Sequence, residues 1–357
     1  MTVMAEEIRQ SPQLVREQLE ASGPALGAVA DAVRRARPRW VSIVARGTSD
    51  HAAVFARYLI ETQLGWPVAL ASPSVTTVYR APTDWTGGLV LAVSQSGRSP
   101  DLVAVVEAAR RGGALTVAVT NVAGSPLELA AAYTVPCRAG EERAVAATKS
   151  YVAELAALAG IVAALVPDSD LAAALPRVPD ALDRTLAATS AWFAGVGGAG
   201  DGRGLELVEA VAVAGRALVV SRGFNLATAL ETALKLKETG RIFAEGYSSA
   251  DLEHGPIALA SAGVPTLVFR PDGPMGAAID PAADRARSLG ARAWTVGGLE
   301  VAGAPDALAI TALAELPECL TPLALILPGQ LLAEAVAVLL GLSPDAPSGL
   351  SKVTLTR

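Results

Sequence analysis

Lysine, histidine and cysteine are scarce in this sequence of 357 residues. Only four of its 29 lysines and arginines are lysine, and histidine and cysteine occur twice each. Cys137 and Cys319 form no Cys-x-x-Cys pair and no cluster with histidine, which excludes a zinc site. Two cysteines can form only one disulfide, which is too few to stabilise a chain of this length through disulfides. We therefore expect no metal and two inert, buried or half-buried thiols in a reducing compartment.

Positive charge is also sparse for a nucleic-acid-binding protein. The net charge is −6, and the sequence has no basic run beyond the cluster at 34–39, which argues against a nucleic-acid partner. The acidic N-terminus lacks the pattern of a secretory signal. The apolar runs 152–165 and 325–342 are interrupted and stay below the roughly 18–20 residues of a membrane-spanning helix. These features predict a cytoplasmic protein with no membrane partner.

The length and an internal repeat indicate two similar halves. About 150 residues per domain predicts about two domains. The apolar run 41–47 recurs at 217–223, and the run that precedes Gly97 recurs before Gly273, both with an offset of 176 residues. Each half alternates short apolar runs with helical stretches. The expected fold class is therefore α/β, with a doubly wound parallel sheet flanked by helices in each half.

Capping signals and composition suggest the boundaries. Ser11, Ser99 and Ser125 each precede a proline, the pattern of a helix N-terminus. The expected segments are N-terminal helices (1–35), a first α/β domain (36–170), a connector (171–200), a second α/β domain (201–340) and a C-terminal tail (341–357).

The segment Ser94–Asp101 is the strongest local motif. It lies between an apolar run and a capped helix, and it contains three serines, one glutamine and Gly97. Such a turn offers backbone amides, hydroxyl donors and a helix N-terminus to one anion, so it predicts a phosphate site. An ordinary serine-rich loop is the alternative. The turn at Thr48–Ser49 adds two hydroxyls, whereas the equivalent turns in the second half have no serine.

A charged helix opens the second half. On a helix, Glu231, Lys235 and Glu238 share one face, while Lys237 points elsewhere. A solvated face of ion pairs is one interpretation, and a general base supported by a lysine is the other. The loop that follows contains His254, which can exchange protons near neutral pH or be structural. The second histidine, His51, is expected either to be structural or to support a residue of the site.

These motifs together resemble the double sugar-isomerase-domain (SIS) proteins. The matching segments run in order through the chain: Gly47–Ser49, Ser94–Gly97, Ala147–Lys149, Leu230–Glu238, Glu253–Pro256 and Leu350–Lys352. The resemblance implies two tandem SIS-type domains. It is nearest to the isomerase half of glucosamine-6-phosphate synthase and to amino-sugar-phosphate deaminases. The glutaminase domain of the synthase has no counterpart in the sequence, which led us to expect no release of ammonia from glutamine.

The resemblance also implies a role for each matching residue. The sugar phosphate is expected at a group of substrate-binding residues: Thr48, Ser49, Ser94, Gln95, Ser96, Ser99, Ala147 and Ser351. Glu238 matches the base that moves a proton between C1 and C2, with Lys235 and Glu231 supporting it. His254 matches the ring-opening histidine, which the family takes from the neighbouring subunit of a homodimer. Lys352 matches a tail lysine that meets the open-chain carbonyl, and no cofactor is implied.

The function expected from this likeness is an isomerising deaminase. It would convert glucosamine 6-phosphate and water into fructose 6-phosphate and ammonia. Two departures, Arg98 for an acidic residue and Ala147 for a serine, bear on which sugar is bound. The alternatives are a fructosamine-6-phosphate deglycase, an aldose–ketose isomerase and a non-catalytic sugar-phosphate sensor. No mechanism is assigned to Lys149 or Lys237.

Overall fold

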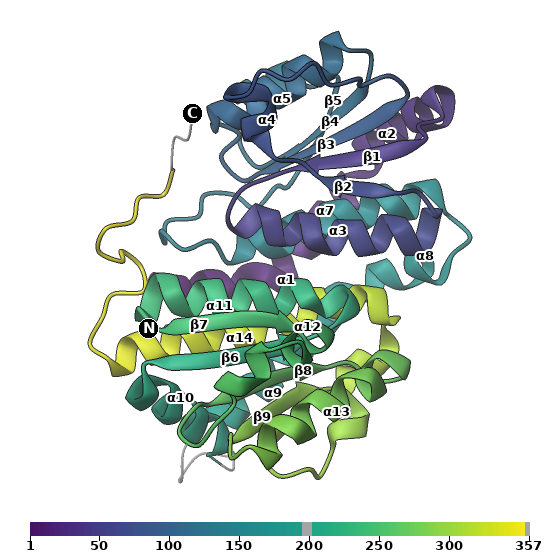
Figure 1. Ribbon diagram of the computed structural model, residues 1–357. Coiled ribbons are helices and arrows are strands. Elements are labelled where there is room, and N and C mark those ends of the chain that lie inside the picture. The colour runs from purple at the N-terminus through teal and green to yellow at the C-terminus, as the bar shows by residue number, and fades with distance from the viewer. Residues whose placement is uncertain (195–201, 354–357) are drawn as a thin grey trace. The chain divides into compact units, whose positions relative to one another are not determined.

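The chain divides into two compact units, each with one parallel sheet (Figure 1). The computed structural model describes residues 1–194 and 202–353. Unit 1 contains Met1–Pro12, Arg143–Thr148 and Arg177–Leu350. Unit 2 contains Gln13–Glu142, Lys149–Pro176 and the described tail from Ser351. Each unit is treated below by itself.

The sheet of unit 2 has five parallel strands in the order β2-β1-β3-β4-β5. Val41 of β1 pairs with Val68 on one side and with Leu89 on the other, which sets the register of the three strands. All seven residues of β3 are buried, as expected of a central strand covered on both faces. The strands are β1 Trp40–Val44, β2 Val68–Leu70, β3 Gly88–Ser94, β4 Leu115–Thr120 and β5 Tyr133–Pro136.

The sheet of unit 1 repeats this arrangement. Its order, read from the other edge, is β7-β6-β8-β9-β10, so each strand has a counterpart at the same place in the first sheet. Leu267 of β8 pairs with Val219 and Trp294, which flank it in β6 and β9. The parallel sheet that the sequence predicts for each half is thus confirmed. They are β6 Arg216–Ser221, β7 Phe243–Ser248, β8 Thr266–Arg270, β9 Ala293–Gly297 and β10 Ala307–Ala309.

Helices cover both faces of the unit 2 sheet (Figure 1). The helices α5 and α6 pack on one face, where Val90 and Ala92 meet Leu102 and Val106 in one buried cluster. The helices α2, α3 and α7 pack against the strands from the other side. The helices of this part of the chain are α2 Gly23–Ala36, α3 Thr48–Leu64, α4 Pro73–Thr77, α5 Pro100–Arg111, α6 Pro126–Ala130, α7 Lys149–Leu165 and α8 Asp170–Ala174.

The unit 1 sheet is covered in the same way. Leu218 and Val268 pack with Leu252 of α12 and Ile279 of α13, while α11 and α14 lie side by side along the other face (Figure 1). The helices are α9 Val178–Phe193, α10 Arg203–Ala214, α11 Leu226–Gly240, α12 Ser249–Glu253, α13 Pro274–Ser288 and α14 Thr321–Leu339, and α1 Val3–Ala21 precedes them all.

Two of the three predicted helix starts are confirmed. Ser99 and Ser125 are the N-cap residues of α5 and α6, and the Ser125 hydroxyl accepts a hydrogen bond from the Glu128 amide. The start predicted at Ser11 is wrong, because α1 continues through Pro12 to Ala21. Proline removes only one backbone donor, and the buried side chains of Met4, Ile8 and Val15 on both sides of Pro12 anchor the helix as one element.

The interruption predicted in the apolar run 325–342 is also absent. The helix α14 passes through Pro328 and Gly329 without ending. Within the described part of the chain, Glu318–Leu339 is the one helical segment long and apolar enough to cross a membrane. However, 78% of its most apolar 18-residue stretch is buried inside the protein. A helix that is mostly buried in the core of a protein has this composition.

The predicted segment boundaries are untested and remain predictions. The expected N-terminal helices correspond to α1 and α2, and the range 171–200 contains α9. The last residues of that connector, 195–200, lie outside the described residues, as do residues 354–357 of the predicted tail.

Close packing between α11 and α14 generates a stability prediction. A Cβ atom on Gly329 would lie 2.1 Å from Thr232 Oγ1, and Thr232 is fully buried, so it cannot swing away. We expect Gly329→Ala to cost about 1–3 kcal/mol and to lower the melting temperature by roughly 2–10 °C. Thermal denaturation followed by circular dichroism measures this.

The matched control is Gly27→Ala in α2. Gly27 is also a helical glycine, but a Cβ there has no heavy atom within 4 Å. Removing its backbone freedom should raise stability by about 0.5–1 kcal/mol. An unchanged or raised melting temperature for Gly329→Ala would contradict the packing argument.

Candidate functional site

The serine-rich turn of unit 2 is built around its own hydroxyl oxygens. Ser94 Oγ accepts a hydrogen bond from the Gly97 amide at 3.2 Å, and Ser96 Oγ accepts one from the Arg98 amide at 3.3 Å. Since the oxygens accept, both hydroxyl hydrogens remain available as donors. The turn therefore offers two hydroxyl donors in the loop that leads into the N-terminus of α5, the arrangement expected for an oxyanion.

Gly97 is required by the shape of this turn. Its φ of +61° is in the region that favours glycine. A Cβ atom there would lie 2.3 Å from Ser125 Oγ and 2.8 Å from Thr120 Oγ1. The carbonyl of Gly97 also accepts from the Leu127 amide at 3.0 Å. The turn is thus tied to the start of α6 and to the end of β4.

The two turns at the carboxyl end of this sheet are joined by an ion pair. Arg46, which follows β1, donates through Nε to Asp101 Oδ2 at 2.9 Å. Asp101 is buried in the first turn of α5. This pair connects the Thr48–Ser49 turn to the Ser94–Ser99 turn, which follow the neighbouring strands β1 and β3. The sequence motifs contain Arg46 and Asp101 but assign no role to either residue.

Ser49 is used differently from the other serines. Its hydroxyl donates to Glu154 Oε1 at 2.8 Å, and both residues are buried. While this bond holds, the hydroxyl hydrogen is occupied, and Ser49 can offer a ligand only its oxygen lone pairs or its backbone amide. Glu154 lies inside the apolar run 152–165 and interrupts it. A buried carboxylate in such a run was the signal that it has a polar partner.

The two cysteines are both buried, as expected. Burial, and next the Glu154 carboxylate, raise the pKa of the Cys137 thiol well above its ordinary value. Its thiolate is therefore disfavoured at neutral pH, and Cys137 is a packing residue.

The charged face of α11 lies inside unit 1. Lys235 and Glu231 have no exposed side-chain area, and Glu238 is 24% exposed. Lys235 Nζ lies 3.3 Å from Glu231 Oε1 and also donates to Glu238 Oε2. The predicted common face is confirmed, and the alternative of a solvated surface face is wrong, because α14 and the sheet cover this side of the helix.

Burial and charge act in opposite directions on Lys235. Burial by itself would lower the pKa of Lys235, but the carboxylates of Glu231 and Glu238 outweigh it and hold the pKa above its ordinary value. The lysine is therefore an ammonium at neutral pH. Two carboxylates share this one cation, and only that of Glu238 reaches solvent.

Glu238 lies in the last turn of α11, far from the turn at Gly223. It lies twelve positions after Leu226, the first residue of the helix, which corresponds to about 18 Å along the axis. The Thr239 hydroxyl next to it donates to Ala333 O of α14 at 3.1 Å. The end of the helix that carries Glu238 is thus fixed by α14.

The remaining predicted residues are distributed over both units. Gln95 and Ser99 are partly exposed in the serine-rich turn, and Thr48 begins α3. Lys352 belongs to unit 2, where it contacts Glu142. Ser351 is exposed next to it. His254 is exposed after α12 in unit 1, and Ala147 belongs to the segment Arg143–Thr148 of the same unit.

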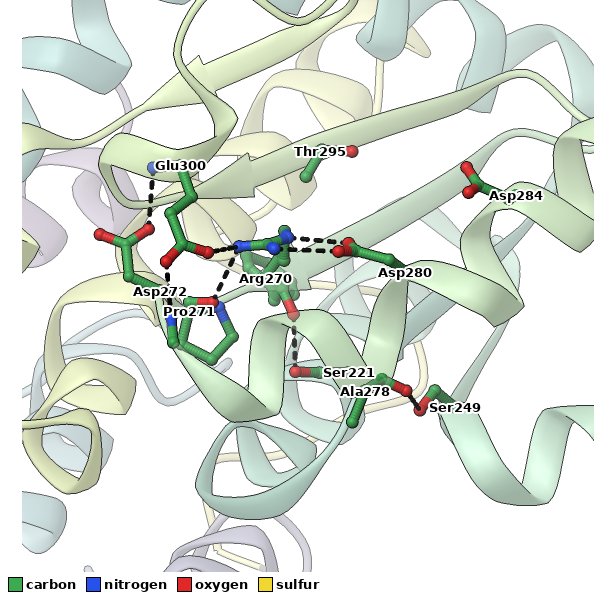
Figure 2. A network of polar contacts seen from close by, with 12 residues as sticks. Ser221, Ser249, Arg270, Pro271, Asp272, Ala278, Asp280, Asp284, Thr295 and Glu300 are labelled. Carbon is green, nitrogen blue, oxygen red and sulfur yellow. Dashed lines mark hydrogen bonds and ion pairs between the residues drawn. The ribbon is translucent and has the colours of Figure 1, made fainter.

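The equivalent turn of unit 1 is filled by the chain's own carboxylates (Figure 2). Glu300 accepts from the Gly273 amide at 3.1 Å and from Arg270 Nη1 at 2.7 Å. Arg270 also forms two hydrogen bonds with Asp280. Asp272 accepts from the amides of Leu299 and Glu300. The Arg270 guanidinium and the Gly273 amide, which could otherwise bind an anion, are thus already occupied.

The charge of Glu300 is favoured by the same contacts. The Arg270 guanidinium, and next the Gly273 amide, hold the pKa of Glu300 below its usual range. Among residues 1–194 and 202–353, no group of three or more histidines, cysteines or acidic residues is placed to hold a metal ion.

Comparisons with known proteins identify the family. The model of the SIS domain matches residues 36–164. The glutamine–fructose-6-phosphate aminotransferase (isomerizing) of Methanothermobacter thermautotrophicus is 36% identical over 356 residues, which cover 98% of this chain and 56% of that protein. The chain spans about half the length of the curated relatives it matches.

Solved structures agree with this assignment. A protein from Silicibacter pomeroyi DSS-3, assigned as a phosphosugar isomerase, is 36% identical with a TM-score of 0.83, and the match covers 97% of this chain and all of that one. Glucosamine-6-phosphate deaminase from Thermotoga maritima has the same fold, with a TM-score of 0.78 over 99% of this chain at 19% identity. The resemblance to SIS-domain phosphosugar isomerases is thus confirmed, and this chain belongs to that family.

Proposed function

We propose that this protein is an isomerising amino-sugar-phosphate deaminase. It converts glucosamine 6-phosphate and water into fructose 6-phosphate and ammonia. The observation that carries the proposal is the Glu231–Lys235–Glu238 array, in which one partly exposed carboxylate is held by a fully buried ammonium. Such a carboxylate is fixed in place and can still reach a substrate, which is what a general base requires.

The proposed substrate is bound through its phosphate. The hydroxyls of Ser94 and Ser96 remain available as donors, and Ser99, Gln95 and Thr48 lie in the same two turns. The sugar end is assigned to the other predicted binding residues, Ser49, Ala147 and Ser351. For Ser49 the contact is through its amide or its oxygen lone pairs, since its hydrogen is donated to Glu154.

The chemical steps follow from proton transfer at two carbons. His254 opens the sugar ring, which gives a 2-amino aldehyde. Glu238 removes the proton from C2 and returns a proton to C1, so that an enamine-like species becomes an imine at C2. Water hydrolyses this imine, which releases ammonia and leaves the ketone. Lys352 is the cation beside the carbonyl oxygen in these steps.

We also propose the domain organisation and the oligomeric state that the family resemblance implies. The two sheets have the same strand order, which supports two tandem SIS-type domains, although the SIS model matches only residues 36–164. We propose that the protein is a homodimer in which His254 serves the neighbouring subunit. The exposure of His254 on its own chain supports this. Location in the cytoplasm remains a prediction.

Two other enzyme reactions share the same proton transfer. A fructosamine-6-phosphate deglycase and an aldose–ketose isomerase differ from the deaminase in the group carried at C1 or C2. An ammonia-release assay over glucosamine, galactosamine and fructosamine 6-phosphates, together with hexose 6-phosphates, separates them. A non-catalytic sensor would bind members of this panel without turnover.

Replacement of the proposed base tests the function directly. We expect Glu238→Gln to lower ammonia release from glucosamine 6-phosphate by about 10²–10⁴-fold, because an amide cannot accept the C2 proton. Binding of the sugar phosphate, measured by calorimetry, should change little. The control is Glu245→Gln, which removes an exposed carboxylate that contacts Lys237. Absence of ammonia release by the unmodified protein from every hexosamine 6-phosphate would refute the proposal.

Loss of the supporting lysine should affect stability as well as turnover. Lys235→Met leaves the carboxylate of Glu231 buried without its cation, which typically costs about 3–5 kcal/mol. Lys237→Met on the same helix removes a 43% exposed side chain and should change stability by about 0.5 kcal/mol or less. Denaturant unfolding distinguishes them, and equal effects would contradict the buried-array argument.

The occupied turn of unit 1 predicts one sugar phosphate per chain. Calorimetric titration should give a single site, and Ser96→Ala should weaken binding about tenfold because it removes a hydroxyl donor to the phosphate. Glu300→Gln, in the turn of unit 1, should leave the affinity unchanged. Two sites per chain, or a loss of affinity in Glu300→Gln equal to that in Ser96→Ala, would be inconsistent with this assignment.

A further inference from the structure

The tail lysine is held by a buried carboxylate that the sequence did not single out. Lys352 Nζ donates to Glu142 Oε2 at 2.8 Å. The Glu142 side chain is fully buried, and Lys352 is 27% exposed. A lysine so near the chain end would have no defined position without such a contact.

The carboxylate of Glu142 is itself fixed by Ser150. The Ser150 amide donates to Oε1 at 3.1 Å, and the Ser150 hydroxyl donates to Oε2 at 2.7 Å. Ser150 is the second residue of α7, so its amide belongs to the first turn, where a helix favours negative charge. Both oxygens of Glu142 are therefore placed by the helix, independently of the lysine.

The segment leading to Glu142 is anchored to the same sheet. Asn121, directly after β4, accepts from the Ala139 amide at 2.6 Å and donates to Gly140 O at 2.7 Å. Lys149 donates to Glu141 O at 2.6 Å. The strand β4 is the neighbour of β3, which carries the serine-rich turn. Glu142 is thus connected by hydrogen bonds to the carboxyl end of the proposed phosphate-binding sheet.

We propose that Glu142 is the positioning residue for Lys352. It holds the Lys352 ammonium on unit 2, which also carries the proposed phosphate-binding turn. The cation and the phosphate site therefore belong to the same compact unit. Glu142 acts through Lys352 and makes no contact with the sugar. The role in turnover rests on the proposed function, whereas the holding of Lys352 does not.

The first experiment measures the reactivity of the Lys352 amine without any substrate. The protein is treated with a small acetylating ester, and the labelling of each lysine is followed by peptide mass spectrometry. The measurement is simple because the chain has only four lysines. In Glu142→Gln, loss of the charged partner should raise the labelling rate of Lys352 about five- to tenfold. Lys237 serves as the internal reference, and its rate should not change.

Two further variants are matched to this change. Glu141→Gln removes the adjacent exposed carboxylate and should leave the labelling of Lys352 as in the unmodified protein. Glu142→Asp keeps the charge and should restore part of the protection. The same rate in Glu142→Gln as in the unmodified protein, or the same rise in Glu141→Gln, overturns the proposal.

The second experiment asks whether the pair acts as one unit in turnover. With the substrate that the panel identifies, Glu142→Gln should lower kcat about tenfold while KM changes less than about threefold, because the phosphate turn is untouched. The double variant with Lys352→Met should be no slower than Lys352→Met alone. Additive losses would show that Glu142 acts on something other than Lys352. If no substrate of the panel is turned over, the proposed function fails, and the labelling result still decides the position of Lys352.

Discussion

The burial of Lys235 is the constraint on which the packing of unit 1 depends. An ammonium without solvent is tolerated only where opposite charges replace its hydration, and Glu231 and Glu238 supply them from the same helix. Water is excluded from this face because α14 lies against α11, close enough that Gly329 has no room for a side chain. The apolar length of α14 and the charge of α11 are therefore two parts of one arrangement.

The same arrangement determines what Glu238 can do. Its carboxylate is bound to a cation that cannot leave, yet a quarter of its side chain is exposed. Glu231 has the same chemistry and lies about two helical turns from Glu238, on the other side of Lys235, but it is fully buried. The difference between a supporting carboxylate and one that can meet a substrate is therefore its depth below the surface, not its type.

The two sheets show how one topology serves two purposes. In unit 2 the turn after β3 keeps hydroxyl hydrogens available for an external anion. In unit 1 the turn after β8 contains an arginine and a helix N-terminus, but Glu300 already accepts from both (Figure 2). In unit 1 the internal carboxylate of Glu300 therefore stabilises the turn. In unit 2 the corresponding turn keeps hydroxyl donors for a ligand.

Much of this could be predicted from local pattern alone. The strands, the repeat, the serine-rich turn and the common face of Glu231, Lys235 and Glu238 all follow from periodicity and spacing, which are properties of neighbouring residues. The start predicted at Ser11 failed because burial of the helix on both sides of Pro12 outweighed one lost hydrogen bond. The apolar run 325–342, expected to be interrupted, likewise begins inside one continuous helix, since the residues around Pro328 are buried.

The sequence by itself determined the fold class, the family and the residue types available for chemistry. Only the tertiary structure decided which of those residues act together. Glu142 and Lys352 are 210 positions apart, and Ser49 and Glu154 are 105 apart. No periodicity links such pairs, because they meet only when strands and helices from distant parts of the chain pack. Burial, which makes Lys235 a fixed cation and not a solvated one, is likewise a property of the packed chain.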